Sequence, residues 1–189
     1  MIRSPLQKVR GLELIARLRL PTTECIILPP KAHDYCEHYI KNHFIPKYGR
    51  IGIRTDTSEI RAGGTPFLFM ESSSDRALAW CRAQQGYWLI LCEPIPPKKV
   101  LVQAHVALRD EYGRLKLWGE ANDTCTRSCR EAVACGTPES GLRDIRHPDM
   151  WRYNEHWANI RRLLKERGLV ERLAEVTVCM DGRLVFWEI

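Results

Sequence analysis

Residues 175–189 read EVTVCMDGRLVFWEI, and the interpretation of the whole chain starts from them. Two runs of β-branched and aromatic residues flank Asp181 and Gly182, a dipeptide that supplies the positive φ angles of a tight turn. This pattern predicts a β-hairpin. Because the hairpin turns at this dipeptide, the start of its first strand lies beside the end of its second strand. We therefore expect Glu175 and Glu188 to be neighbours.

Two carboxylates at one end of a hairpin suit a particular metal ion. Mg²⁺ is a hard cation that takes a few carboxylate oxygens and leaves its other positions to water and substrate phosphates. The sequence thus predicts a metal site at Glu175 and Glu188. The alternative is a pair of solvated glutamates at strand ends, which is common on protein surfaces.

Length and composition describe an ordinary folded protein. A chain of 189 residues with 44% hydrophobic and 28% charged residues can build one substantial core or two small lobes. No apolar run approaches the roughly 20 residues of a membrane span. The N-terminal stretch, with Arg3, Lys8 and Arg10, lacks the apolar centre of a signal peptide. We expect a cytoplasmic protein.

The net charge of +6 raises the question of a nucleic-acid partner. The basic residues are dispersed along the chain, and their main cluster, 161–167, reads as a solvated helix face with acidic residues close by. Eight cysteines are expected to be reduced thiols. The spacing of Cys125, Cys129 and Cys135 fits no zinc pattern, so we interpret them as structural thiols, with a metal or redox role as the alternative.

Hydrophobic periodicity and breakers divide the chain into alternating helices and strands. The expected helices are Leu6–Leu20, Lys31–Ile45, Ser73–Gln85 and Asp149–Arg167. The expected strands before the final hairpin are Cys25–Leu28, Ile51–Arg54, Pro66–Met70, Tyr87–Glu93, Val100–Arg109 and Arg114–Glu120.

Arg54 is the second residue to which the pattern assigns chemistry. It ends a short apolar strand and is followed by a loop that contains Gly63 and Gly64. A guanidinium bonds phosphate oxygens in pairs, and glycine lets a backbone approach closely, so the arrangement is typical of a phosphate-binding site. The alternative is a surface ion pair of Arg54 with Asp56 or Glu59.

The order of these elements resembles the ATP-grasp fold. Residues 87–95 are similar to the hinge of that family, residues 100–120 to the hairpin after the hinge, and residues 175–188 to the terminal hairpin. The resemblance implies an α+β fold of two lobes, 1–93 and 94–189, with antiparallel sheets and flanking helices that close on ATP. It also implies that Glu93 and Ile95 contact adenine and that Glu175 and Glu188 hold Mg²⁺.

A narrower likeness covers residues 14–54, which are similar to the N-terminal ATP-binding region of phosphoenolpyruvate synthase and pyruvate phosphate dikinase. By this resemblance Arg54 contacts nucleotide phosphate and has a catalytic role, and a lysine such as Lys116 or Lys47 offsets the remaining charge. Family members usually place an asparagine two residues beyond the second acidic residue, where this chain has ended. Either that ligand is missing, or Glu120 or Asn122 replaces it.

The function expected from the resemblance is binding of ATP with Mg²⁺. An active protein would be a ligase or phosphotransferase that activates the carboxylate of a small molecule or peptide, and a degenerate relative would only bind the nucleotide. The second hypothesis is a basic nucleic-acid- or protein-binding module without catalysis. That module would show no Mg²⁺-dependent stabilisation by ATP.

Overall fold

The computed structural model describes residues 2–3, 5–59, 61–62, 65–122 and 143–189. The chain forms two compact units, the first made of 1–10 and 23–96 and the second of 11–22 and 97–189. The sequence analysis expected a single boundary between the two lobes, after Glu93. In the structure residues 11–22 belong to the second unit, although they precede most of the first unit in the sequence. Gly63, Gly64 and the three cysteines at 125, 129 and 135 lie outside the described residues.

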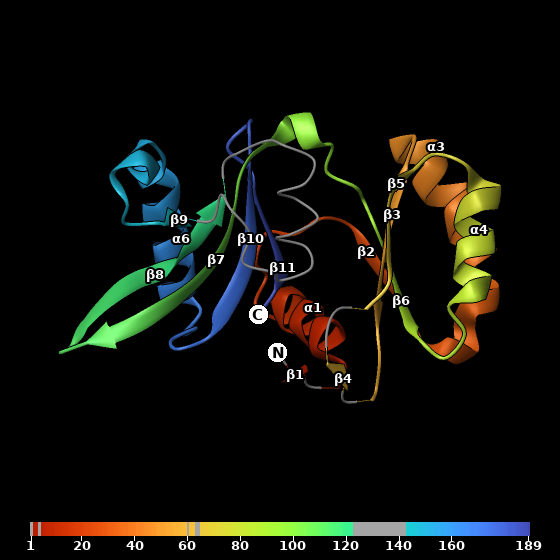
Figure 1. Ribbon diagram of the computed structural model, residues 1–189, viewed down its shortest axis with the longest axis horizontal. Coiled ribbons are helices and arrows are strands. Elements are labelled where there is room, and N and C mark those ends of the chain that lie inside the picture. The colour runs from red at the N-terminus through yellow and green to blue at the C-terminus, as the bar shows by residue number, and fades with distance from the viewer. Residues whose placement is uncertain (1, 4, 60, 63–64, 123–142) are drawn as a thin grey trace. The chain divides into compact units, whose positions relative to one another are not determined.

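The first unit is built on a four-stranded antiparallel sheet of order β2-β6-β3-β5 (Figure 1). A two-stranded pair, β1 with β4, accompanies it. The strands are β1 (Ile2–Arg3), β2 (Cys25–Leu28), β3 (Ile51–Asp56), β4 (Arg61–Ala62), β5 (Phe67–Glu71) and β6 (Trp88–Cys92). The helical segments are η1 (Pro30–Tyr35), α2 (Cys36–Tyr39), a π-helical turn η2 (Ile40–Phe44), α3 (Ile45–Tyr48) and α4 (Ser74–Ala83).

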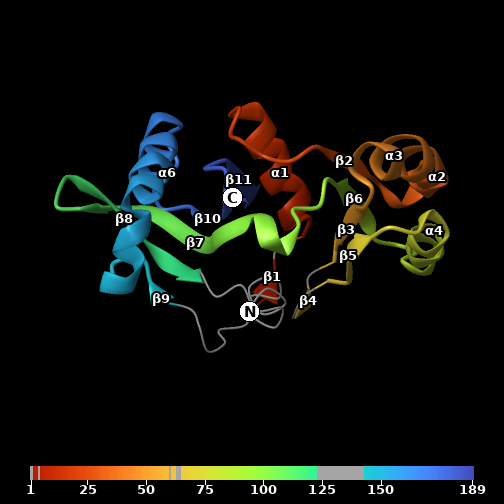
Figure 2. The same ribbon diagram turned by 90° about the horizontal axis from the view of Figure 1, so that it is seen from above.

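The core of the first unit lies on one side of this sheet. Figure 2 shows α2, α3 and α4 together on that side. Ile40 and Phe44 of η2 are completely buried there against Ile51, Ile53 and the apolar residues of β6. Because successive side chains of a strand alternate in direction, the intervening residues of β3, Gly52 and Arg54, belong to the other face.

The second unit is a five-stranded antiparallel sheet of order β11-β10-β7-β8-β9. Its strands are β7 (Val100–Glu111), β8 (Arg114–Asn122), β9 (Arg143–Asp144), β10 (Leu173–Cys179) and β11 (Leu184–Glu188), and its helical segments are η3 (Pro97–Lys99), η4 (Pro148–Tyr153) and α6 (Asn154–Glu166). Helix α6 packs on β7 and β8 (Figure 1). Every second residue of β7 from Val102 to Leu108 is buried, whereas Gln103 and His105 between them are half-exposed.

Helix α1 (Gln7–Arg17) contributes residues to both units. Its start is fixed in the first unit, where the Val9 backbone N–H donates to an Asp56 carboxylate oxygen at 2.9 Å. The segment after it is fixed in the second unit, where the Phe186 N–H donates to the Pro21 carbonyl at 2.8 Å and the Thr22 hydroxyl donates to the Phe186 carbonyl at 2.8 Å.

Most of the expected elements are confirmed, with shifts of a few residues at their ends. Strand β2 has the expected bounds, and the final hairpin turns where Asp181 and Gly182 predicted it. The helix expected at 31–45 is a chain of short 3₁₀, α and π segments from Pro30 to Tyr48. Within the described part of the chain, no helix has both the length and the apolar character needed to span a membrane.

Candidate functional site

Glu175 and Glu188 are directly opposite each other on β10 and β11. This confirms that they are neighbours. A β-bulge follows Glu175, so two residues of β11 oppose one step of β10 at this point. Both side chains are half-buried, and both make interactions with the rest of the protein. Residues directly opposite in an antiparallel pair point to the same face of the sheet, so the two carboxylates belong to one face.

The carboxylate pair is one end of a row of titratable residues that crosses the whole sheet. Glu175 is opposite His105 of β7, His105 is opposite Glu120 of β8, and Glu120 is opposite Asp144 of β9. All five residues therefore share a face, and we call them the polar row: Glu188, Glu175, His105, Glu120 and Asp144. Glu120, one of the two residues expected as a replacement ligand, lies in this row.

The far end of the polar row is neutralised by an arginine. Arg146 donates to the Asp144 carboxylate, with Nε 2.8 Å from Oδ1, and lowers the pKa of Asp144 to about 2. The same guanidinium lies 3.6 Å from the ring centroid of Trp118. Asp144 is thus paired with Arg146. Glu188, Glu175 and His105 form the other end of the row.

The next row on the same face is polar but uncharged. Gln103 is opposite Thr177 on one side and Asn122 on the other, and its amide donates to the Thr177 hydroxyl at 3.4 Å. The Trp187 indole N–H also donates to this hydroxyl, at 2.9 Å. Asn122, the other expected replacement ligand, therefore lies one row away from the carboxylate pair.

The donor set at Glu175 and Glu188 fits Mg²⁺. Among the described residues no group of three or more His, Cys, Asp or Glu side chains is arranged to hold a metal ion. Such a group is the requirement of a site built from protein ligands alone. Mg²⁺ needs only one or two carboxylates when water and substrate phosphates complete its shell, and two adjacent carboxylates meet this lower requirement.

Sequence reasoning missed His105 and Gln103 as members of this face. The signal was present in β7, where polar residues occur at every second position between Val102, Ala104 and Val106. Their alignment with Glu175 and Glu120 depends on pairing between strands that are far apart in the sequence.

Arg54 lies in β3, opposite Ile90 of β6 and Phe67 of β5. Its side chain is half-buried and engaged with other groups of the protein. It shares the sheet face opposite that of α2, α3 and α4 with Gly52, Cys92 and Cys25, as the register of β2, β6 and β3 requires. The guanidinium acts electrostatically on both of these thiols.

Glu93 and Ile95 follow β6 in the segment that leads to the second unit. The Glu93 N–H donates to the Glu24 carbonyl at 3.0 Å, and the Ile95 side chain is buried. Glu24 also pairs with Lys47, one of the two lysines that the sequence analysis expected to offset phosphate charge. Lys47 donates to its carboxylate at 2.8 Å, Tyr48 at 2.5 Å, and these bonds, with a further one from His43, lower the pKa of Glu24 to about 2.

Lys116 lies in β8 on the face of the polar row, two positions from Trp118. Its amine is 2.6 Å from a Glu111 carboxylate oxygen, and it is exposed. The ion pair is what lowers the pKa of Glu111. Exposed ion pairs of this kind are weak because solvent screens them, so the Lys116 amine remains available to another partner.

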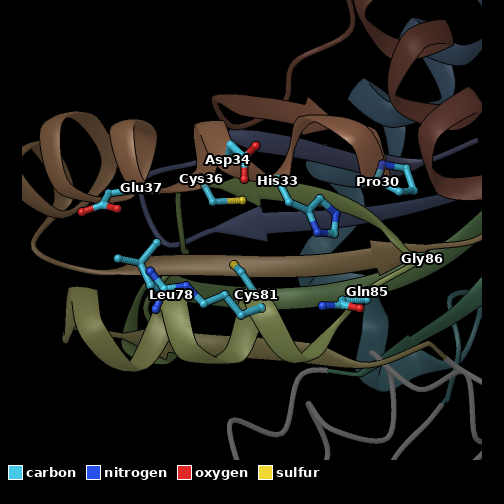
Figure 3. Close-up of a pocket in the computed structure, with 10 residues that line it drawn as sticks. Pro30, His33, Asp34, Cys36, Glu37, Leu78, Cys81, Gln85 and Gly86 are labelled. Atoms are coloured by element: carbon cyan, nitrogen blue, oxygen red, sulfur yellow. The ribbon is translucent and has the colours of Figure 1, made fainter.

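A pocket of about 580 Å³ lies within the first unit, between η1 and α2 on one side and α4 on the other. Figure 3 shows Cys36 and Cys81 facing each other from the two helices, with His33, Asp34 and Glu37 nearby. None of the site residues expected from the sequence lines it. The pocket is therefore distinct from the residues assigned to the nucleotide.

No protein-family model matches the chain, and a search of curated proteins finds no significant match. Solved structures do match. D-alanyl-alanine synthetase A from Vibrio cholerae has a TM-score of 0.52 at 13% identity, over 97% of this chain and 54% of that one. The VanG D-Ala:D-Ser ligase from Enterococcus faecalis has a TM-score of 0.55 at 12% identity, over 97% and 51%.

N5-carboxyaminoimidazole ribonucleotide synthetase, solved as an ADP complex, also matches, with a TM-score of 0.52 at 16% identity over 98% of this chain and 44% of that one. The fold is that of the ATP-grasp ligases. The chain spans about half the length of these three enzymes. At these identities the likeness shows the fold alone.

Proposed function

We propose that this ATP-grasp chain binds ATP together with Mg²⁺ and serves the activation of a carboxylate, as part of a ligase or phosphotransferase. The observation that carries the proposal is the pairing of Glu175 with Glu188 at the end of the terminal hairpin. His105, opposite Glu175 on β7, adds a further polar side chain beside this pair.

Glu175 and Glu188 would hold the metal ion, which when bound offsets phosphate charge and orients the nucleotide for in-line transfer. Arg54 would donate to phosphate oxygens as a bidentate group. Lys116 would leave its weak ion pair with Glu111 and bind a phosphate oxygen instead. Backbone groups around Glu93 and Ile95 would contact adenine. This segment directly follows strand β6, as expected for the hinge of the ATP-grasp fold.

The narrower hypothesis, a relationship with the ATP-binding region of phosphoenolpyruvate synthase and pyruvate phosphate dikinase, rests on Arg54 and its strand. It predicts that Arg54→Gln weakens nucleotide binding at least as strongly as Lys116→Gln does. The acceptor would be a small molecule or peptide that carries a carboxylate, and its identity is a matter for substrate screening.

The test is thermal unfolding with and without saturating ATP and MgCl₂, on the wild type, Glu175→Gln and Glu188→Gln. A ligand present at a hundred times its Kd stabilises the folded state by about 2.7 kcal/mol. For a chain of this length that corresponds to a rise in Tm of about 5 to 10 °C. We expect this rise in the wild type and a much smaller one in both variants.

Glu155→Gln is the matched control, since it removes the same charge from the same unit, on an exposed position of α6. It should keep the full ligand-induced rise in Tm. Equal rises in the wild type and in Glu188→Gln would remove the carboxylate pair from the site. No rise in any of the proteins would favour the binding module without catalysis.

A further inference from the structure

Cys25 and Cys92 are partners in neighbouring strands of the first unit. They are directly opposite each other on β2 and β6. The adjacent pair, Glu24 and Glu93, is hydrogen-bonded through the Glu93 N–H and the Glu24 carbonyl at 3.0 Å. Because hydrogen-bonded and non-hydrogen-bonded pairs alternate in an antiparallel ladder, Cys25 and Cys92 occupy a non-hydrogen-bonded pair.

This position has the backbone geometry that a disulfide needs. Opposite Cα atoms in a non-hydrogen-bonded pair are about 4.5 Å apart, and their side chains approach each other more closely than in the alternate pairs. Disulfides span Cα separations of about 4.4 to 6.8 Å. A bond between the two sulfurs would therefore close without displacing either strand.

The Cys92 sulfur is held in place beside its partner. It is 4% exposed, and its thiol donates to the Gly52 carbonyl at 3.4 Å. A Cβ at Gly52 would lie 3.1 Å from this sulfur, so the glycine leaves the room that the thiol occupies. The two thiols also act on each other, since Cys92 lowers the pKa of Cys25 and Cys25 raises that of Cys92.

Cys25 is the more reactive member of the pair. It is only partly buried, whereas Cys92 is almost completely buried, and the contact with Cys92 lowers the pKa of its thiol, with further lowering by the Thr23 hydroxyl and the charge of Arg54. Burial and the charge of Glu93 act in the opposite direction. Redox-active cysteines typically combine an accessible thiolate with a second thiol beside it, and Cys25 with Cys92 has both features.

A second pair in the same unit provides an internal comparison. Cys36 and Cys81 are in contact across the pocket described above, but each is only 2% exposed. The charge of Asp34 disfavours the Cys36 thiolate. This pair thus has the sulfur contact but lacks an exposed thiol.

We propose that Cys25 and Cys92 form a redox modification site that undergoes reversible thiol–disulfide exchange with low-molecular-weight disulfides such as oxidised glutathione. The Cys25 thiolate attacks one sulfur of the small disulfide, forms a mixed disulfide and releases one thiolate, which takes up a proton. The Cys92 thiol then loses its proton to solvent and attacks the Cys25 sulfur, which releases the second small thiol. Two protein thiols are oxidised, and one small disulfide is reduced to two thiols.

The proposal does not depend on ATP binding, because it concerns the reactivity of the two thiols alone. The bond would join the ends of the segment from residue 25 to residue 92, which makes up most of the first unit. It would lie on the same sheet face as Arg54, one row away from it.

The experiment uses the full chain with Cys125, Cys129 and Cys135 replaced by serine, so that these thiols cannot react. The folded protein is incubated with oxidised glutathione, alkylated and digested with trypsin, and its peptides are analysed by mass spectrometry. Cleavage after Arg and Lys places Cys25 in peptide 20–31 and Cys92 in peptide 83–98, whereas Cys36 lies in 32–41, Cys81 in 77–82 and Cys179 in 173–183. The five remaining thiols are therefore distinguished.

We expect a cross-link between peptides 20–31 and 83–98 that disappears on treatment with a dithiol, and its unchanged formation in the control variant Cys81→Ser. In Cys92→Ser the mixed disulfide has no partner to resolve it, so Cys25 should retain glutathione. Circular dichroism checks that each variant is folded. Full alkylation of Cys25 after oxidation, or a cross-link of 32–41 with 77–82 in place of the expected one, would overturn the proposal. So would an unmodified Cys25 in the folded Cys92→Ser variant.

Discussion

Replacement of Gly119 by alanine tests the strand register on which the polar row depends. Gly119 lies in β8 opposite Val106 of β7, with a φ of +157°. A Cβ at this position would lie 2.2 Å from the His105 carbonyl oxygen and 2.8 Å from the Val106 Cα. Both are backbone atoms, so no change of rotamer removes the clash. The two strands would have to separate by about 1 Å to reach ordinary contact distances.

The expected loss of stability follows from these contacts. Overpacking costs about 1 to 3 kcal/mol where side chains can adjust, and more where they cannot. Separation of β7 from β8 also weakens two or three ladder hydrogen bonds, each worth about 1 kcal/mol. We expect Gly119→Ala to lower the free energy of unfolding by about 4 kcal/mol. This is a large part of the roughly 5 to 15 kcal/mol typical of folded domains.

The assay is denaturant unfolding followed by circular dichroism and tryptophan fluorescence, with Gly182→Ala as the matched control. Gly182 has a φ of +81° and open space around the added Cβ. Its replacement should cost only the strain of a left-handed conformation, about 1 to 2 kcal/mol. If Gly119→Ala is no less stable than Gly182→Ala, β7 and β8 do not pair as described. His105 would then no longer be opposite Glu120, and the polar row would not exist.

Substitutions at three further residues test local contacts by equilibrium unfolding. Asp56→Ala removes the carboxylate that accepts the Val9 N–H at the start of α1 and should cost about 2 kcal/mol, whereas Asp56→Asn, which keeps an acceptor, should cost less than half as much. The pKa of Glu24 is lowered from 4.5 to about 2, so its contribution is present above pH 4.5 and is lost as the pH falls toward 2. Glu24→Gln should therefore be about 1 kcal/mol less stable than the wild type at neutral pH, after allowance for solvent screening, and the difference should vanish in acid, whereas a pH-independent difference would contradict this pairing. Thr177→Val deletes the hydroxyl that accepts the Trp187 indole N–H and should cost about 1 kcal/mol, while Thr177→Ser, which keeps the hydroxyl, should restore most of it.

The elements themselves could be predicted because their signals are local. Strand β2 has the bounds that its apolar run and the following prolines indicate, and the last hairpin turns at Asp181 and Gly182 as predicted. The helix expected at 31–45 was correct in type, but its division into 3₁₀, α and π segments was not predictable. The packing of Ile40 and Phe44 onto the sheet accompanies this division, and periodicity carries no information about it.

The sequence by itself predicted that Glu175 and Glu188 are neighbours, but the pairs next to the turn, such as Thr177 with Val185, would by themselves place Glu175 opposite Trp187. The β-bulge between Glu175 and Val176 brings Glu188 opposite Glu175. Only the tertiary structure decided that His105 lies next to this pair, that residues 11–22 belong with the second unit, and that Cys25 meets Cys92. Each of these depends on pairing between segments separated by tens of residues. Such pairing is selected by the burial of whole sheet faces, and no short stretch of sequence encodes it.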